Sequence, residues 1–196
     1  MGELLSDDDS VFRMVVHPVA FKGKSFSRGK MINLTTLSER EIETSLVWEK
    51  FLASEADLHS SGCDLASRMN ERTRIEKGEV KPKNRKIYCG AYQLPVAALG
   101  NLRLEAELPE IETTEVRHAP EDGQEAHVSL RVTLKHDYEG DVEGTKTAIA
   151  DRIWASLHGP LRHICTCDDA INPHPSGDLE DCPLGSYSFP SLRSSS

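Results

Sequence analysis

The sequence predicts a mixed α+β fold, in which an antiparallel sheet is covered on one face by two helices. Apolar residues between 128 and 138 occupy alternate positions, the period of a strand with one buried face. From Thr145 onward they recur three and four apart, which is the period of a helix. Asp122-Gly123 separates two extended stretches and is typical of a tight hairpin turn. Because a one-sided sheet and a one-sided helix each need an apolar cover, each can cover the other.

Length and composition fit a globular chain with a core of its own. The 196 residues are 38% apolar and 28% charged, and a chain of this size buries about 70% of its unfolded surface. No apolar run reaches the ~18 residues of a membrane span, and the acidic start MGELLSDDDS lacks the features of a secretory signal. We therefore expect a cytoplasmic location without membrane contact. Five scattered cysteines then predict reduced thiols.

We divide the chain into an N-terminal arm (1–36), an α+β domain (37–160) and an irregular C-terminal arm (161–196). In the first arm, 11–17 is rich in β-branched residues, but Pro18 predicts an edge or short strand. MINL (31–34) predicts a second short strand, so the arm is expected to resemble a hairpin. The last 36 residues contain several prolines and glycines and end in SFPSLRSSS. They predict little regular structure.

Two helical segments are predicted in the first half of the domain. Ser38-Glu39-Arg40-Glu41 has the form of a capping box, and an apolar stripe follows it at helical spacing. The stripe consists of Ile42, Leu46, Val47, Phe51 and Leu52. HSSGC (59–63) is expected to interrupt the helix, and a weaker helix is predicted over 64–74.

The second half of the domain predicts the sheet. Strands are expected over 87–92, 102–108, 111–118 and 128–138, with the inward side chains of 102–108 being Leu102, Leu104, Ala106 and Leu108. The closing helix carries Ile149, Ile153 and Leu157 on one stripe. Gly159-Pro160 predicts its end, through a left-handed cap followed by a residue that cannot continue a helix.

Charge is distributed unevenly along the chain. The segment 68–86 has eight basic residues against three glutamates, so it carries +5, and the rest of the chain carries −14. We expect a basic loop that contacts acidic partners. It has no interleaved aromatic residues before Tyr88, which argues against base stacking. The predicted partner-binding residues are Arg72, Arg74, Lys77, Lys81, Lys83, Arg85 and Lys86.

Motifs of nucleophilic, phosphate-binding, dinucleotide-binding and zinc-protease sites do not occur, and we predict a protein that is not an enzyme and has no cofactor or bound metal. One alternative is a zinc site built from Cys165, Cys167 and Cys182 with His163 or His158, although Cys-x-Cys is not the usual spacing. Asp137, Glu139, Asp141 and Glu143 are interpreted as a solvated turn that favours the following helix start. His127 and His136 are predicted on opposite faces of one strand, so they cannot form a pair.

The order of elements over 37–160 resembles that of the tail-terminator and neck-ring proteins of tailed bacteriophages. The residues that carry the resemblance are LSEREIETSLVWEKFLASEADL, LRLEAELPEIETTEVRH, HVSLRVTLKHDY and TAIADRIWASLHG. The resemblance implies a structural virion protein, assembled in the host cytoplasm, that forms a ring, commonly of six subunits. Its implied partners are other copies of itself, tail-tube and connector proteins, and DNA that passes through without sequence-specific binding. It implies no catalytic residue.

Acidic residues are consistent with such a channel. Residues 102–143 carry twelve acids against four basic residues, and an acidic sheet face would repel passing DNA. The predicted channel-facing residues are Glu105, Glu107, Glu112 and Glu115. Two alternatives remain open: a small intracellular metal-dependent enzyme that uses the Cys- and His-rich tail, and a monomeric module that binds nucleic acid or an acidic partner through the basic loop.

Overall fold

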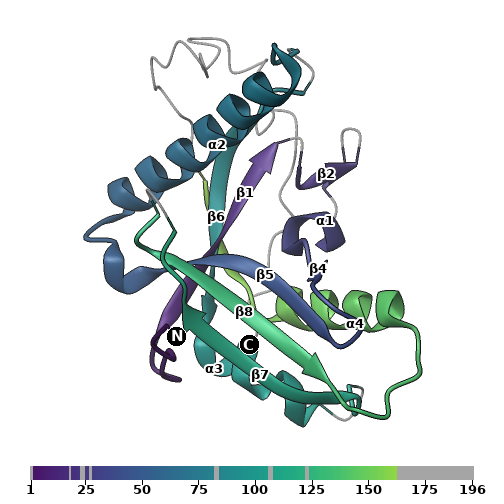
Figure 1. The fold of residues 1–196 in the computed structure, drawn as a ribbon. Helices are drawn as coiled ribbons and strands as arrows, with labels where there is room; N and C mark the ends of the chain where they lie inside the picture. Colours follow the sequence, from purple (N-terminus) through teal and green to yellow (C-terminus); the bar gives the residue numbers. More distant parts are fainter. Residues whose placement is uncertain are drawn as a thin grey trace.

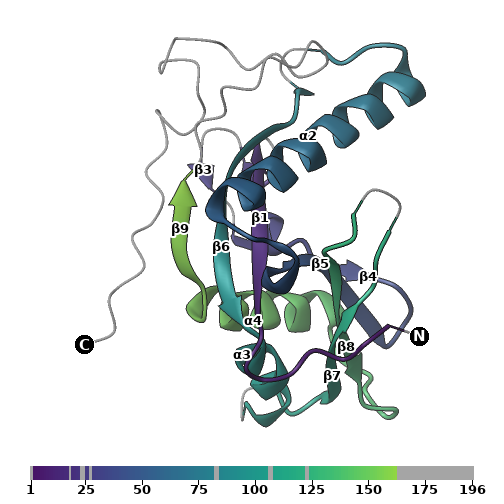
Figure 2. The ribbon, with the colours of Figure 1, turned by 90° about the vertical axis from the view of Figure 1, so that its left-hand side faces the viewer.

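The computed structural model describes residues 2–17, 19–22, 25–26, 28–81, 84–105, 108–121 and 124–162. These residues build a seven-stranded antiparallel sheet in the order β7-β8-β5-β1-β6-β9, with β4 beside β5, and a separate pair of β2 with β3 (Figures 1 and 2). The predicted α+β class with an antiparallel sheet is confirmed. The strands are β1 (Ser10–His17), β2 (Phe21–Lys22), β3 (Ser25–Phe26), β4 (Thr35–Thr36), β5 (Glu41–Trp48), β6 (Ile87–Pro95), β7 (Ile111–His118), β8 (His127–Leu134) and β9 (His158–Arg162).

Helices lie on both faces of the sheet. They are α1 (Arg28–Ile32), α2 (Glu55–Lys77), α3 (Val96–Gly100) and α4 (Val142–Ala155), together with the 3-10 turns η1 (Glu49–Phe51) and η3 (Asn101–Leu104). Neighbouring residues of β1 point to opposite faces: Val11 packs in the cluster that contains α4, whereas Phe12 packs in the cluster that contains α2. The two long helices therefore cover opposite faces, not the single face that the sequence predicted.

The larger core lies on the α4 side of the sheet and includes residues of β1, β5, β6, β7 and β8. Val128, Leu130, Val132 and Leu134 of β8 are all fully buried there, as the alternation predicted. Ile149 and Ile153 of α4 pack in the same cluster. Each large apolar side chain buried in this way contributes roughly 1.5–3 kcal/mol before conformational entropy is subtracted. The switch from strand to helix spacing thus corresponds to β8 and the helix that covers it.

The predicted helix over 38–52 is wrong, because residues 41–48 form strand β5. Ile42, Thr44, Leu46 and Trp48 are buried in alternation, and β5 pairs with β8 over seven residues. Ser38 does not cap a helix; its hydroxyl accepts a hydrogen bond from the Arg40 amide at 3.3 Å in the turn before β5. A buried threonine, Thr44, interrupts the apolar alternation, so the strand pattern is not evident in the sequence.

Helix α2 runs without interruption through 59–63 and through the predicted second helix. It begins at Ser54, whose side chain accepts from the Asp57 amide, and ends at Gly78 in the left-handed conformation with φ of 78°. Gly62 lies against β6, where a Cβ atom would overlap the ring of Tyr88. Gly62 and Cys63, from the segment that resembled a helix break, are therefore buried where α2 packs on the sheet. The weaker helix predicted over 64–74 is thus part of α2, and residues 68–77 of the expected basic loop belong to this helix.

Two other N-terminal elements differ from the prediction. β1 is an interior strand between β5 and β6, not an edge strand; it ends at His17, and Pro18 lies outside the described residues. Residues 28–32 form α1, where a short strand over 31–34 was expected. The first residues run along the free edge of β7, with the Leu5 amide donating to the Val116 carbonyl at 2.9 Å.

Differences also occur in the second half. Residues 101–104 form η3 in place of the start of the predicted strand over 102–108, and 106–107 are not among the described residues. Helix α4 ends at Ala155, and Gly159, with φ of 115°, lies in β9 and does not cap the helix. β9 pairs with β6 and includes the first two residues of the predicted C-terminal arm. Residues 163–196 lie outside the described part of the chain.

Candidate functional site

The candidate site begins at a fork between two strands of the sheet. β1 and β5 pair at only two positions, Val11 with Trp48 and Phe12 with Val47, and then diverge. Figure 1 shows α1 in the opening between them. Thr44 of β5 donates from its hydroxyl to the Ile32 carbonyl of α1 at 2.6 Å. Beyond the fork, the main-chain groups of β1 and β5 no longer pair with each other. Side chains and α1 provide hydrogen-bond partners in place of the neighbouring strand.

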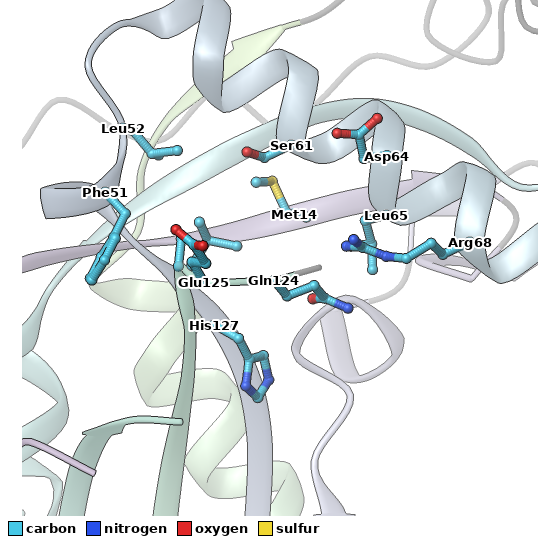
Figure 3. A pocket seen from close by; sticks show the side chains of 12 residues that line it. Met14, Phe51, Leu52, Ser61, Asp64, Leu65, Arg68, Gln124, Glu125 and His127 are labelled. Carbon is cyan, nitrogen blue, oxygen red and sulfur yellow. The ribbon is translucent and has the colours of Figure 1, made fainter. Parts of the chain in front are cut away.

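A trough runs from this fork beneath α2, and we call it the α2 trough. It consists of two adjoining hollows of about 420 Å³ and about 180 Å³. Met14, Val47 and Leu65 line both, as do Gln124 and His127. In the smaller hollow, side chains of α2 face residues that precede β8 or begin it (Figure 3). The trough therefore has an apolar floor and polar rims, the lining typical of binding clefts.

Arg13 forms part of the wall of the larger hollow. Its Nε donates to the Met31 carbonyl at 2.6 Å and its Nη1 donates to the Ser45 carbonyl at 2.5 Å. Among the described residues, no carboxylate lies within 4 Å of this guanidinium. Burial lowers the pKa of Arg13 to about 10, so the group keeps its charge at neutral pH. Lys30 and Arg72 line the same hollow, and the acid there is Glu121. The larger hollow is consequently cationic.

His127 forms the opposite side of the trough. It is buried, and its Nδ1 lies 2.6 Å from the Ala119 carbonyl oxygen. Because a carbonyl oxygen only accepts, Nδ1 carries the proton. His127 is buried on β8, whereas His136 is exposed in the turn after β8. The two histidines therefore do not form a pair. His127 holds the connection between β7 and β8 in place and so shapes the trough.

An aromatic cluster closes one end of the trough. Phe51 of η1, predicted as a core residue of a helix, is 44% exposed. Its ring stacks on the ring of His118 with 4.7 Å between centroids, and the Trp48 ring lies 5.5 Å away. Figure 3 shows Phe51 and Leu52 at one end and Arg68 at the other. The end of the trough therefore has an exposed apolar surface held by fixed rings.

Most of the predicted partner-binding residues lie away from the trough. Arg72 and Arg74 are exposed on α2 and pair with Glu76 (2.8 Å) and Glu71. These bonds raise the pKa of both arginines. Lys81 lies 3.9 Å from Glu79. The cationic field of this segment is thus partly neutralised within it, and of its predicted residues that the structure describes, only Arg72 also lines the trough.

The end of the basic segment leads into β6. Asn70 is fully buried and clamps the main chain of Lys86, accepting from its amide at 2.7 Å and donating to its carbonyl at 2.9 Å. Burial, with a smaller effect of Lys77, lowers the pKa of Lys86. Arg85 is half-buried, and Lys83 lies outside the described residues. The predicted residues at this end therefore do not form one exposed patch.

The structure does not gather the predicted channel-facing acids. Glu105 follows η3, with its carboxylate 3.9 Å from Arg152 of α4. Glu112 pairs with Arg40 at 3.0 Å. Glu115 pairs with Arg117 at 2.8 Å, and this hydrogen bond lowers the pKa of Glu115. Glu107 lies outside the described residues.

The half of the sheet that α2 leaves uncovered has a polar outer face. Glu43 and Arg131 stand opposite each other on β5 and β8, with their charged groups 3.5 Å apart, and Glu115 is the neighbour of Arg131 on β7. Ser129 donates to Glu43 at 2.5 Å. This face presents both signs of charge in alternation and no large apolar side chain.

Predicted metal ligands are only partly within the described structure. Cys165, Cys167, Cys182 and His163 lie outside it, whereas His158 is the first residue of β9. The described residues contain no group of three or more His, Cys, Asp or Glu side chains that could hold a metal ion. In the acidic turn, the Asp141 carboxylate caps α4 by accepting a hydrogen bond from the Glu143 amide at 3.0 Å. This agrees with the prediction that the turn favours the start of the following helix.

Apart from Arg72, the described residues that build the trough were not predicted as site residues. Arg13 and Met14 of β1 precede Leu65 of α2 by more than 50 residues, and no local pattern connects them. One signal was present in the sequence: Arg13 interrupts the apolar run of 11–16, and a lone charge inside an apolar strand indicates a specific role.

No protein-family model matches the chain, and no curated protein or solved structure matches it. Within the described part of the chain, no helix has the combination of length and apolar character that crossing a membrane requires.

Proposed function

We propose that the protein is a structural subunit, not an enzyme, that joins copies of itself head to tail into a closed ring, as expected for tail-terminator and neck-ring proteins of tailed bacteriophages. In that role it belongs to the virion, is assembled in the host cytoplasm, and contacts tail-tube and connector proteins. A ring of six copies is the expected size. The proposed activity is assembly, and no residue has a catalytic part.

The α2 trough is the observation that carries this proposal. It has an apolar floor, charged rims and an exposed ring at one end, and such a surface suits a protein partner. A trough on one surface that receives a projection from another surface gives a heterologous contact, which closes into a ring when the rotation permits. The resemblance now rests mainly on β8 followed by α4, because 41–48 is a strand where the resemblance has a helix.

The uncovered polar face of the sheet supports the second part of the proposal. Glu43 and Glu115 lie on this face, and in a ring that turned it inward they would repel the phosphates of passing DNA. Arg117 and Arg131 offset two of these charges, and Glu41, which follows the same alternation of β5 as Glu43, leaves one acid in excess. Glu105 follows η3, and Glu112, at the register shift of β7, is paired with Arg40, so the inner wall proposed here rests on fewer of the predicted acids.

The mass of the purified full-length chain in solution tests the proposal. Light scattering coupled to size-exclusion chromatography, repeated over a range of concentrations, should give a multiple of 21.8 kDa near six copies. The same measurement in the presence of tail-tube and connector proteins should increase the assembled fraction. A 21.8 kDa species under all of these conditions would overturn the proposal.

A monomeric binding module is the second candidate function, and the cations around the larger hollow favour it. Arg13, Lys30 and Arg72 would then attract an acidic partner or the phosphates of a nucleic acid. This function predicts a monomer whose affinity for DNA or for an acidic peptide decreases steeply with salt. Ring formation predicts assembly without either ligand.

A further inference from the structure

Two apolar side chains stand out on the described surface because most of their area contacts solvent. Leu104 is 71% exposed and Ile75 is 72% exposed. Leu104 ends η3, where the neighbouring Leu102 is buried and anchors the turn. η3 packs on α3 and β7. Leu104 is therefore presented by a fixed corner of the protein, whereas Ile75 projects from the last turns of α2.

The corner that carries Leu104 lies far from the α2 trough. Figures 1 and 2 both show α3, which leads directly into η3, at the end of the molecule opposite to α2. One chain therefore cannot place its own Leu104 in its own trough. A contact between these two surfaces has to join two copies, and it leaves a free trough on one copy and a free Leu104 on the other. Such a contact is head to tail.

We propose that Leu104 of one copy inserts into the α2 trough of the next copy, and this inference rests on the proposed head-to-tail assembly. Insertion removes the leucine from water and covers the apolar floor formed by Met14, Val47 and Leu65. An apolar side chain anchored in a pocket is the arrangement that concentrates binding energy in protein interfaces.

Charge complementarity supports the same pairing. Glu105, next to Leu104, carries a carboxylate whose partner within the chain is Arg152 at 3.9 Å, a loose and partly exposed ion pair. Exposed pairs of this kind contribute little to stability, so exchanging the partner costs little. The larger hollow offers Arg13 and Arg72 as cations on its wall. An apolar side chain beside a carboxylate therefore matches an apolar floor beside cations.

Two single substitutions test the pairing, each removing one side of it. Leu104→Asp leaves the trough intact, and Val47→Glu leaves Leu104 intact while placing a charge in the trough. We expect each variant alone to run as a monomer in native mass spectrometry, whereas the wild type assembles. An equimolar mixture should form a dimer of one copy of each variant, because one productive contact remains. Circular dichroism of each variant checks folding, and Leu65→Glu replaces Val47→Glu if that variant is unfolded.

Ile75→Asp is the matched control, since Ile75 has the same exposure as Leu104 and does not line the trough. It should assemble as the wild type does. A wild type that assembles together with a Leu104→Asp variant that also assembles would overturn the pairing but not the proposed function. A mixture of two folded monomeric variants without any dimer would have the same meaning. A wild type that stays monomeric would overturn both.

Discussion

The guanidinium of Arg13 donates a hydrogen bond of 2.5 Å to the main-chain carbonyl of Ser45, across the fork where β1 and β5 separate. A second bond to Met31 ties α1 to the same point. A side chain thus replaces the strand pairing that the fork removes, and in doing so it places a positive charge at the wall of the α2 trough. Stability of the fork and charge of the trough therefore depend on the same residue.

Replacing Arg13 by methionine should destabilise the protein by about 2 kcal/mol, because the carbonyls of Ser45 and Met31 lose charged donors, with partial relief from removing a buried charge. Urea unfolding measures the change in the free energy of unfolding. Arg103→Met, at an exposed position, should change it by less than about 0.5 kcal/mol. Equal effects of the two substitutions would contradict the role given to Arg13.

Gly62→Ala should destabilise the protein by about 1–3 kcal/mol, although alanine is the better helix former. The added Cβ meets the ring of Tyr88, which is fully buried and has its hydroxyl 3.2 Å from Nδ1 of His59. The ring therefore has little freedom to move. Gly29→Ala in α1, where the Cβ meets nothing within 4 Å, should be neutral or stabilising by up to about 1 kcal/mol. Thermal unfolding measures the stability of both variants. If Gly62→Ala were the more stable of the two, the packing argument would be wrong.

Asn70→Ala should cost about 2–3 kcal/mol, because it removes both hydrogen bonds to the main chain of Lys86. Asn70→Asp keeps the acceptor for the Lys86 amide but turns an acidic oxygen toward the Lys86 carbonyl. We therefore expect hydrogen exchange at the C-terminal half of α2 and the start of β6 to increase in both variants. Unchanged exchange in these segments would show that the clamp does not hold α2 on the sheet.

Stability should decrease as the pH falls below 6.5, because burial, with a smaller effect of Lys86, lowers the pKa of His17 from its ordinary value of 6.5. The unfolded chain then binds a proton more readily than the folded protein, so the contribution of neutral His17 is complete above pH 6.5 and is lost below it. His17→Asn should flatten the free energy of unfolding between pH 6.5 and the carboxylate range near 4.5. The same substitution at the exposed His136 controls for the change of residue type.

The sequence predicted those elements whose period was not disturbed by buried polar or small residues. β8 and α4 were predicted from their apolar spacing because each buries a continuous apolar set against the other. β5 was mistaken for a helix, since Thr44 occupies a buried position of the strand and its apolar neighbours also fit helical spacing. The region around Gly62 was mistaken for a helix break. Its glycine is small because it contacts Tyr88, on a strand 26 residues later, and this contact is not visible in the local sequence.

The candidate site was beyond sequence reasoning for a different reason. The trough depends on where β1 and β5 diverge, and that point is set by the packing of α1 and by Arg13, not by any local motif. The exposure of Leu104 was also hidden, because its spacing in LRLEAEL suggested a buried strand position. The 3-10 turn rotates Leu104 away from Leu102, so one is a core residue and the other faces solvent.

Electron microscopy of the purified full-length chain in negative stain tests ring formation most directly. The proposal predicts closed rings of uniform diameter with a central opening, and the loss of these rings in Leu104→Asp but not in Ile75→Asp. Open fibres, or fields without any assembled particles at concentrations where the chain is folded, would contradict it.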